Sequence, residues 1–188
     1  IGRIHDKMGE RLANNAELIF QDCFIPDENV VGEVGNGFNV LAKFFPQSNA
    51  YAGASVLGVA EACYNKSVEW AKIRVQGGKP IIEHDGIRAQ LAEMRMLIDA
   101  SRSYIHRACY LADHQEAGGD KTLGVLPKTM ASQAAWKIAT WCLEIHGGHG
   151  YMKEFGVAKL VRDAACFLHS DGVNRTLFLK AANFMFKD

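Results

Sequence analysis

A single carboxylate, Asp171, interrupts an apolar helical pattern in the segment DAACFLHSDGVN, residues 163–174. The ordinary interpretation is that Asp171 or Asn174 caps the next helix by accepting a hydrogen bond from a backbone N–H group. The alternative is that a carboxylate at a junction between apolar helices is partly desolvated and acts as a general base. Spacing alone favours the cap, and both interpretations stay open at this point.

Two glycine-rich segments could also bind a ligand. In RVQGGKP (74–80), Arg74 and Gln76 precede a pair of glycines. Exposed backbone N–H groups beside a guanidinium suit a phosphate. The ordinary interpretation is the end of a helix with a basic residue in its last turn, and spacing alone favours it.

The second segment is EIHGGHGYM (144–152), where three glycines within four residues allow a ligand or another chain to approach the backbone closely. His146 and His149 have a spacing that a metal could use, but no neighbouring cysteine or carboxylate cluster completes a ligand set. We therefore expect a tight turn between helices here, and no metal.

Helical patterns dominate from residue 36 onward and must position these segments. Long helices are expected over about 38–74, 82–116 and 126–145, and shorter ones over 154–170 and 174–186. Long helices that are joined by short glycine-rich turns indicate an up-down bundle of the four-helix type. The predicted fold class is therefore mainly α.

The first 35 residues have a different character. From Ala16 the stretch AELIFQDCFIP alternates between apolar and polar residues until Pro26, which predicts a strand, and glycine-rich turn residues follow. We expect residues 1–35 to be the edge of a separate β element and residues 36–188 to be the helical bundle domain. Because the sequence begins at Ile1 without an initiator methionine, we also expect it to be part of a longer protein.

Composition restricts the kinds of partner. Hydrophobic residues make up 48% of the chain, and 21 Lys and Arg balance 21 Asp and Glu, so neither nucleic acid nor a charged membrane surface is an expected partner. No apolar stretch is long enough to span a membrane, and no signal-peptide pattern is present, which favours the cytosol or, in a eukaryote, the mitochondrial matrix. The five cysteines never form a C-x-x-C motif and are interpreted as small buried residues.

These segments occur in an order that resembles the acyl-CoA dehydrogenase family. MGERLANNAELIFQDCFIPDENVVGEVGNGF is similar to the end of the family's middle β domain. RVQGGKPIIEH followed by LAEM resembles its R-x-Q-F-G-K-P-I…L-A-D-M segment, and EIHGGHGYMKEFGVAKLVRDA resembles Q-I-H-G-G-x-G-Y…R-D-A. The motifs keep the family's mutual spacing over nearly all of the chain. The resemblance implies the tail of a middle β domain followed by the C-terminal helical bundle of a flavoprotein.

The resemblance also implies an activity. Members of the family bind FAD, oxidise the Cα–Cβ bond of an acyl-CoA thioester, and pass electrons to an electron-transfer flavoprotein. They form homo-oligomers, so a dimer or tetramer is expected here. Asp171 lies eight residues after Asp163 of R-D-A, where the family commonly has its catalytic glutamate. The resemblance therefore assigns Asp171 as the base that removes the α-proton, and the backbone N–H of Gly172 as a donor to the thioester oxygen.

Five further residues match positions that contact FAD in the family. Arg74 and Gln76 match contacts to the pyrophosphate, often that of the neighbouring subunit. Glu144 and Gly148 match positions on the adenine side, although the family more often has glutamine at the former. Val173 stands where a threonine often touches the flavin.

Departures from the family pattern leave alternatives open. Aspartate is one methylene shorter than the commoner glutamate, Ser170 replaces a usual tyrosine, and Gly77 replaces an aromatic residue. An aspartate base followed by glycine also resembles the nitroalkane oxidases, so a flavin oxidase of the same fold, of nitroalkane- or acyl-CoA-oxidase type, is one alternative. The arginine expected seven residues after the base of these oxidases is Phe178 here. A non-catalytic partner subunit is another alternative, because several of the family's site positions have changed.

Overall fold

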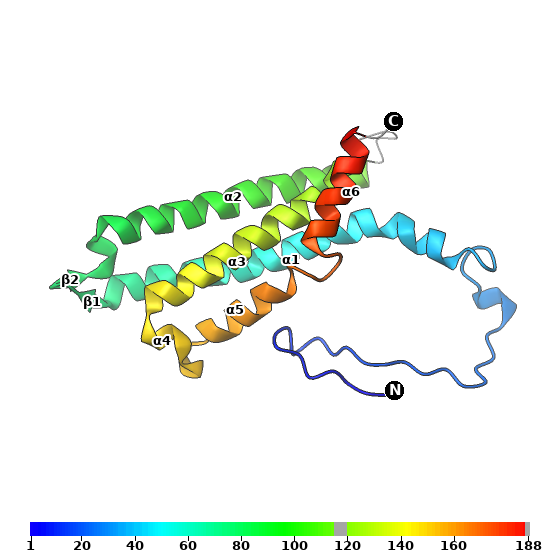
Figure 1. The fold of residues 1–188 in the computed structure, drawn as a ribbon, viewed down its shortest axis with the longest axis horizontal. Coiled ribbons are helices and arrows are strands. Elements are labelled where there is room, and N and C mark those ends of the chain that lie inside the picture. Colours follow the sequence, from blue (N-terminus) through cyan, green and yellow to red (C-terminus); the bar gives the residue numbers. More distant parts are fainter. Residues whose placement is uncertain (115–119, 187–188) are drawn as a thin grey trace.

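The computed structural model describes residues 1–114 and 120–186, which form a mainly helical fold. Three long helices lie side by side, namely α1 (Gly37–Ile73), α2 (Asp85–Asp113) and α3 (Leu126–His146). The shorter α5 (Val157–Cys166) packs against α1 and α3 (Figure 1). Successive helices of this bundle run in opposite directions (Figure 1), so the predicted mainly α, up-down architecture is confirmed.

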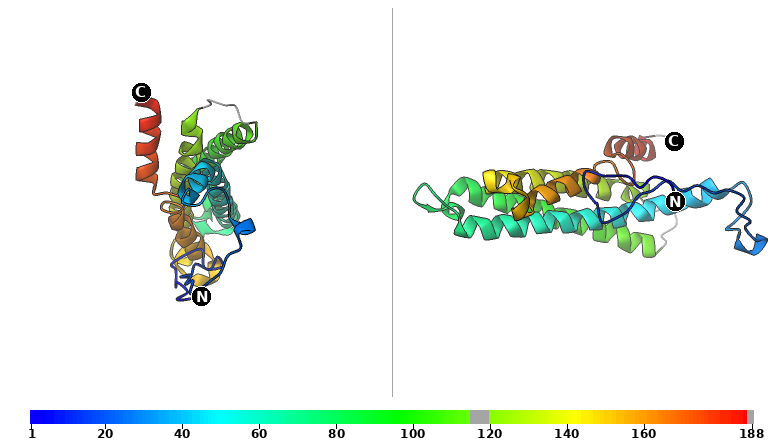
Figure 2. Two further views of the ribbon diagram at one scale, coloured as in Figure 1. Left: turned by 90° about the vertical axis from the view of Figure 1, so that its right-hand side faces the viewer. Right: turned by 90° about the horizontal axis from the view of Figure 1, so that it is seen from below.

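Short elements precede α1 or connect the helices to one another. They are η1 (Asp27–Asn29), β1 (Val75–Gln76), β2 (Lys79–Pro80), η2 (Ile81–Glu83), η3 (Lys121–Gly124), α4 (Gly148–Tyr151) and η4 (Lys153–Phe155). The last helix, α6 (Asn174–Phe186), crosses the bundle rather than continuing along it (Figure 2). None of the described helices is long and apolar enough to cross a membrane.

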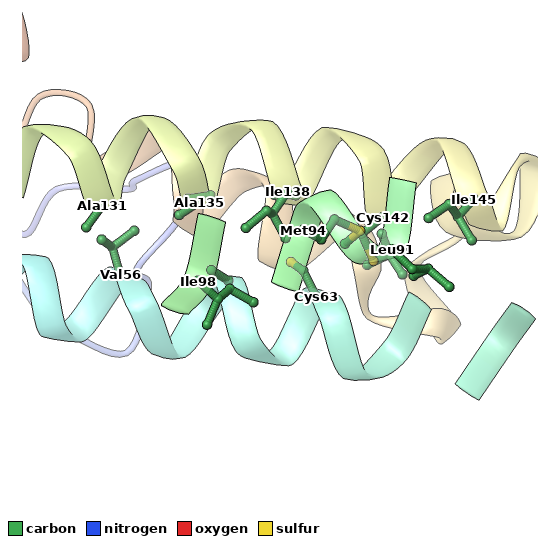
Figure 3. Close-up of a cluster of buried hydrophobic side chains, with 14 of the residues drawn as sticks. Val56, Cys63, Leu91, Met94, Ile98, Ala131, Ala135, Ile138, Cys142 and Ile145 are labelled. Atoms are coloured by element: carbon green, nitrogen blue, oxygen red, sulfur yellow. The ribbon is translucent and has the colours of Figure 1, made fainter. Parts of the chain in front are cut away.

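The core lies where α1, α2 and α3 face one another. Figure 3 shows its central layer, in which Met94 and Ile98 of α2 meet Ile138 of α3 between the neighbouring helices. Small side chains on one face of α3 let the helices approach closely, and those that are fully buried include Ala131, Ala135 and Ala139. Burying each large apolar side chain contributes about 1.5–3 kcal/mol, so this seam is the main source of the bundle's stability.

The connection between α1 and α2 is a two-stranded hairpin, which the sequence interpretation did not include. β1 pairs with β2 in antiparallel register through Val75 opposite Pro80 and Gln76 opposite Lys79. The two residues of its turn, Gly77 and Gly78, both have positive φ angles, of 60° and 79°. Two-residue hairpin turns require such angles, which glycine adopts without strain. The glycine pair therefore reverses the chain within the hairpin, whereas α1 has already ended at Ile73, with Arg74 as its C-cap residue.

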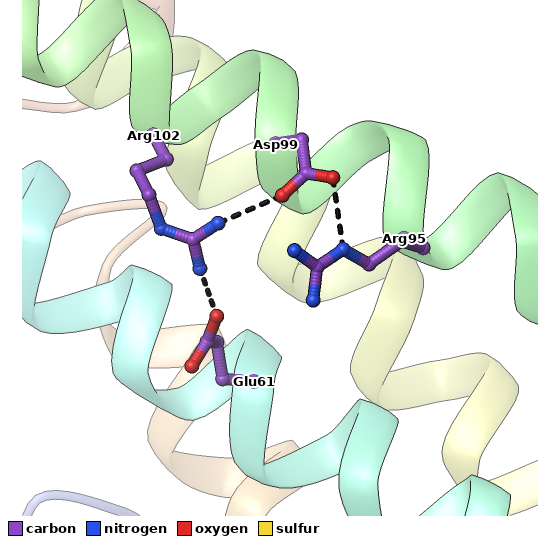
Figure 4. A network of polar contacts seen from close by, with 4 residues as sticks. All are labelled: Glu61, Arg95, Asp99 and Arg102. Atoms are coloured by element: carbon purple, nitrogen blue, oxygen red, sulfur yellow. Dashed lines mark hydrogen bonds and ion pairs between the residues drawn. The ribbon is translucent and has the colours of Figure 1, made fainter.

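A cluster of ion pairs fastens α2 to α1 on the solvent side (Figure 4). The guanidinium of Arg102 pairs with Glu61 of α1 and, at 2.7 Å, with Asp99 of its own helix. Arg95 binds the other oxygen of Asp99 at 2.8 Å. All four side chains are partly exposed, so each pair contributes at most about 1 kcal/mol.

The N-terminal arm, residues 1–26, is extended and does not contain the predicted strand over residues 16–26. Its regular pairing is limited to one isolated antiparallel bridge between Ile4 and Ala16. Leu18, Phe20 and Phe24 are 65%, 75% and 86% exposed. An apolar alternation becomes a regular strand only when neighbouring strands bind its backbone and cover its apolar face. Within the described residues only Ala16 and Glu17 of this stretch pair with a neighbouring segment, residues 2–5, and its apolar side chains stay uncovered, so the predicted regular strand over residues 16–26 is not formed.

The arm is nevertheless attached to α5 at one point. The backbone N–H of Glu10 donates to the buried carboxylate of Asp163 at 2.8 Å, and Arg162 Nε donates to the Met8 carbonyl at 3.1 Å. Gly9 lies so close that an added Cβ would be 2.4 Å from the carbonyl oxygen of Arg162. Two adjacent residues of α5 therefore hold the arm against the bundle.

Several predicted boundaries need correction. The helix predicted over 154–170 is divided, because Gly156 adopts a left-handed conformation between η4 and α5, and α5 ends at Cys166. The helix predicted over 82–116 begins at Asp85 and ends at Asp113, and the residues after 114 up to 119 lie outside the described part. Cys63 and Cys142 are buried as predicted, whereas Cys23 is exposed and the other two cysteines are half-buried.

Candidate functional site

The structure brings four of the predicted site residues together at one end of the bundle. Arg74, Gln76, Glu144 and Gly148 line one groove of about 270 Å³, where the end of α1 and the hairpin meet the end of α3 and the start of α4. We call this the Arg74 groove. Its walls come from segments about 70 positions apart in the chain, which meet because α1 and α3 pack along each other.

Aromatic rings form the inner wall of the Arg74 groove. The indole of Trp70 stacks on His146 with ring centres 5.2 Å apart and lies 4.8 Å from the ring of His149. Phe155 meets Trp70 edge-on at 5.6 Å. The indole Nε1 of Trp70 is buried and has no hydrogen-bond partner among the described residues, which is uncommon for a buried donor. The wall therefore offers flat apolar surface and one unused N–H group.

The two histidines of this segment take part in packing. His146 is buried and its Nδ1 donates to the Cys142 carbonyl at 2.8 Å, in the preceding turn of α3. His149 packs against Trp70 and Phe155. In the described ranges, no group of three or more His, Cys, Asp or Glu side chains is placed to hold a metal ion.

The polar side of the groove is held by the hairpin. Arg74 Nη2 donates to Gln76 Oε1 at 3.3 Å, and His84 Nε2 donates to the Gln76 carbonyl at 2.9 Å. Arg74 is exposed and has no carboxylate partner among the described residues, so most of its N–H donors are available. A guanidinium beside an aromatic wall can bind a ligand that combines a phosphate with a flat ring.

The other predicted site residues lie in the connection between α5 and α6. We call residues 167–173 the Asp171 turn. Asp171 has a φ angle of 51° and Gly172 one of 105°, and the backbone N–H of Asn174 closes the turn by donating to the Leu168 carbonyl at 3.1 Å. An alanine at 172 would be strained by this positive φ angle, and its Cβ would lie only 2.9 Å from the side chain of Leu177 in α6.

The Asp171 carboxylate does not cap α6. Its side chain is exposed, and neither it nor Asn174 accepts a hydrogen bond from a backbone N–H among the described residues. The amide of Asn174 instead points inward, where it exchanges hydrogen bonds with Ser132 of α3 at 2.9 and 3.2 Å. The ordinary interpretation of Asp171 as a helix cap is therefore wrong. The helix before it has already ended, at Cys166.

A lysine that sequence reasoning missed lies directly beneath the Asp171 turn. Lys128 of α3 is fully buried, and its Nζ donates to the Gly172 carbonyl at 2.8 Å and to Asn174 Oδ1 at 3.0 Å. Burial lowers the pKa of Lys128 to about 8, although the negative charge of Asp171 opposes that shift. The sequence did contain a signal for this burial. Lys128 is three residues before Ala131 and seven before Ala135, and at helical spacing these residues lie on one face of α3.

The two locations are far apart within one chain. Lys128, which contacts the Asp171 turn, and Glu144, which lines the Arg74 groove, are sixteen residues apart on α3. At about 1.5 Å per residue they are separated by about 24 Å. Figure 1 shows the corresponding arrangement, with α4 and the hairpin at one end of the bundle and the α5–α6 connection nearer the other. Asp171, Gly172 and Val173 therefore do not form one pocket with the four groove residues of the same chain.

Comparison with known proteins gives consistent matches along the chain. Residues 35–185 match the family model described as acyl-CoA dehydrogenase, C-terminal domain. The short-chain specific acyl-CoA dehydrogenase of Megasphaera elsdenii is 36% identical over 92% of this chain and 45% of its own length. The cyclohex-1-ene-1-carbonyl-CoA dehydrogenase of Geobacter metallireducens is 35% identical over 93% of this chain and 46% of its own length.

A solved structure gives the same result. Butyryl-CoA dehydrogenase from Megasphaera elsdenii is similar with a TM-score of 0.93 and 33% identity, over 99% of this chain and 48% of that one. The chain thus spans about half the length of the relatives that it matches.

Proposed function

Because the chain belongs to the acyl-CoA dehydrogenase family, we propose that it is the C-terminal part of an FAD-dependent enzyme that oxidises the Cα–Cβ bond of an acyl-CoA thioester. In this proposal residues 1–35 belong to the middle β domain and residues 36–188 form the helical domain. The observation that carries the proposal is the Arg74 groove, where four residues that the family resemblance assigns to the cofactor meet.

The Arg74 groove suits one part of FAD. Arg74 and Gln76 would hold the pyrophosphate, and Glu144 and Gly148 would lie on the adenine side. The unpartnered Nε1 of Trp70 and the flat wall around it support a ligand with an aromatic ring and acceptor atoms. When bound, FAD supplies the acceptor for a hydride.

Asp171 is the proposed base for the α-proton. Its carboxylate has no hydrogen-bond partner among the described residues, and the backbone N–H of Gly172 beside it likewise has no acceptor there. This N–H group can therefore donate to the thioester oxygen and stabilise the enolate, and Val173 would lie near the flavin ring. Asp171 is exposed in this chain, so the proposal requires that bound substrate and other parts of the enzyme exclude water from it.

Self-association is part of the proposal. A second groove of about 400 Å³ lies between α2, α3 and α6, and its lining includes Leu97, Met130 and Phe178. Phe186 of α6 is 81% exposed. Exposed apolar side chains and an apolar groove of this kind are typical of an interface. We propose that another copy of the protein covers it in a dimer or tetramer, and that an electron-transfer flavoprotein accepts the electrons.

The test uses the full-length protein with FAD bound. Asp171→Asn should leave the FAD content unchanged but prevent anaerobic bleaching of the flavin by a panel of straight, branched and cyclic acyl-CoA esters. Bleaching at the wild-type rate would show that Asp171 is not the base. Rapid peroxide formation without a protein electron acceptor would instead favour a flavin oxidase with the same aspartate.

A further inference from the structure

Lys128 occupies an unusual environment for a lysine. Its side chain is fully buried in the bundle, and among the described residues no carboxylate forms an ion pair with it. Lysine is almost never fully buried unless it is paired, because removing an ammonium group from water is costly. The hydrogen bonds of its Nζ go to Gly172, which follows Asp171 in the Asp171 turn, and to Asn174, the first residue of α6.

These contacts fix a backbone conformation that is otherwise unfavourable. Asp171 has a left-handed φ of 51°, which costs a non-glycine residue about 1–2 kcal/mol. The carbonyl of Gly172, which follows it, is tied to Lys128 on one side, while Asn174 is tied to Lys128 and Ser132 on the other. The peptide plane between Gly172 and Val173 and the side chain of Asn174 are therefore held directly by α3, a core helix.

We propose that Lys128 is a positioning residue that holds the Asp171 carboxylate and the Gly172 N–H in the geometry the reaction needs. The inference rests on the proposed function of Asp171. Lys128 acts through the Gly172 carbonyl and through Asn174, and does not itself contact the substrate. A displacement of about 1 Å in a reacting group can lower a rate about a hundredfold, so one anchoring contact is enough to matter.

The experiment compares Lys128→Met with a matched control, Lys137→Met, in the flavin-loaded full-length protein. Lys137 is nine positions further along α3 and pairs with Glu93 at the surface. In Lys128→Met we expect faster amide hydrogen exchange in residues 168–177, an unchanged rate in the core of α1 to α3, and an unchanged FAD content. The limiting rate of flavin reduction should fall about ten- to a hundredfold, with little change in affinity for a non-oxidisable acyl-CoA analogue. Lys137→Met should change none of these.

A second variant separates positioning from stability. In Lys128→Met/Asn174→Leu the lysine and its side-chain partner both become apolar at similar size, a change that is often nearly neutral for stability, and the carbonyl of the exposed Gly172 can bind water instead. Ser132 keeps a partner, because its hydroxyl also donates to the Thr129 carbonyl at 3.1 Å. A purely structural role predicts that the reduction rate recovers together with the thermal stability. A positioning role predicts that the rate of flavin reduction stays low although the protein is stable. The double variant also provides the test if Lys128→Met alone does not fold.

The outcomes distinguish the inference from the proposed function. If Asp171→Asn blocks flavin reduction but Lys128→Met leaves both reduction and exchange of residues 168–177 at wild-type levels, the positioning role is overturned and the base remains. If the flavin of Asp171→Asn is reduced by the substrate at the wild-type rate, the proposed role of Asp171 as the base is overturned, and the positioning role of Lys128 is overturned with it.

Discussion

Replacement of Lys128 by methionine should change how stability depends on pH. The pKa of Lys128 is lowered by burial to about 8, from an ordinary value of 10.5. Between these two values the unfolded chain binds more protons than the folded one, so this residue makes the free energy of unfolding rise with pH. The buried charge therefore destabilises the fold below about pH 8, and this penalty is progressively lost as the pH rises toward 10.5.

The magnitude follows from the difference between the two pKa values. Each unit corresponds to about 1.4 kcal/mol, so the full effect is at most about 3.5 kcal/mol. Methionine has a similar length and no charge, and it lacks this dependence. Relative to Lys128→Met, the wild type should gain up to about 3.5 kcal/mol of stability between pH 7 and pH 10.5.

Urea unfolding at a series of pH values would measure this gain. The two proteins share every other titrating group, so the difference between their unfolding free energies isolates Lys128. The Lys137→Met variant provides the control, because its lysine is about half exposed, and its difference from wild type should stay nearly constant with pH. A difference between wild type and Lys128→Met that is equally constant would refute the buried ammonium.

Three further predictions concern the groove, the turn and the arm. Arg74→Lys should weaken FAD retention on dilution, because lysine cannot form the two parallel hydrogen bonds that a guanidinium gives to a phosphate, whereas Arg88→Lys on the exposed face of α2 should not. Gly172→Ala should lower the free energy of unfolding by about 1–3 kcal/mol, because a φ of 105° is strained for alanine. Gly58→Ala should leave it unchanged or raise it, because Gly58 lies within α1 with open space around it. Asp163→Ala should release the N-terminal arm, because alanine has no acceptor for the Glu10 N–H, and limited trypsin digestion would detect the release as faster cleavage within residues 3–11; cleavage at the wild-type rate would contradict the attachment.

The sequence was sufficient for the helical part of the fold. The limits of α1 and α3 agree with the predicted ones within a residue, because long apolar periodicities end at glycine-rich turns on both sides. The residues of the Arg74 groove were also predictable, since a family resemblance transfers positions in a motif whatever their local structure.

Other features depend on tertiary contacts that no local pattern encodes. Among the residues that the structure describes, the alternating arm segment has no neighbouring strand along most of its length, so its periodicity does not produce a regular strand here. The helical spacing of Lys128 to Ala131 and Ala135 indicates a core-facing position, but its polar partners are known only once α6 and its connection cover it. Trp70 could have been found, because it lies one helical turn before Arg74 and therefore on the same face of α1.

The length of α3 has a genetic consequence. It separates the Asp171 turn from the Arg74 groove by about 24 Å, so damage at one end leaves the other end intact. If neighbouring copies each lend one end to a shared centre, a hybrid of an Asp171→Asn subunit and an Arg74→Ala subunit would contain one centre with both lesions and one with none. Two inactive parents, co-expressed, would then complement each other and recover a fraction of the activity.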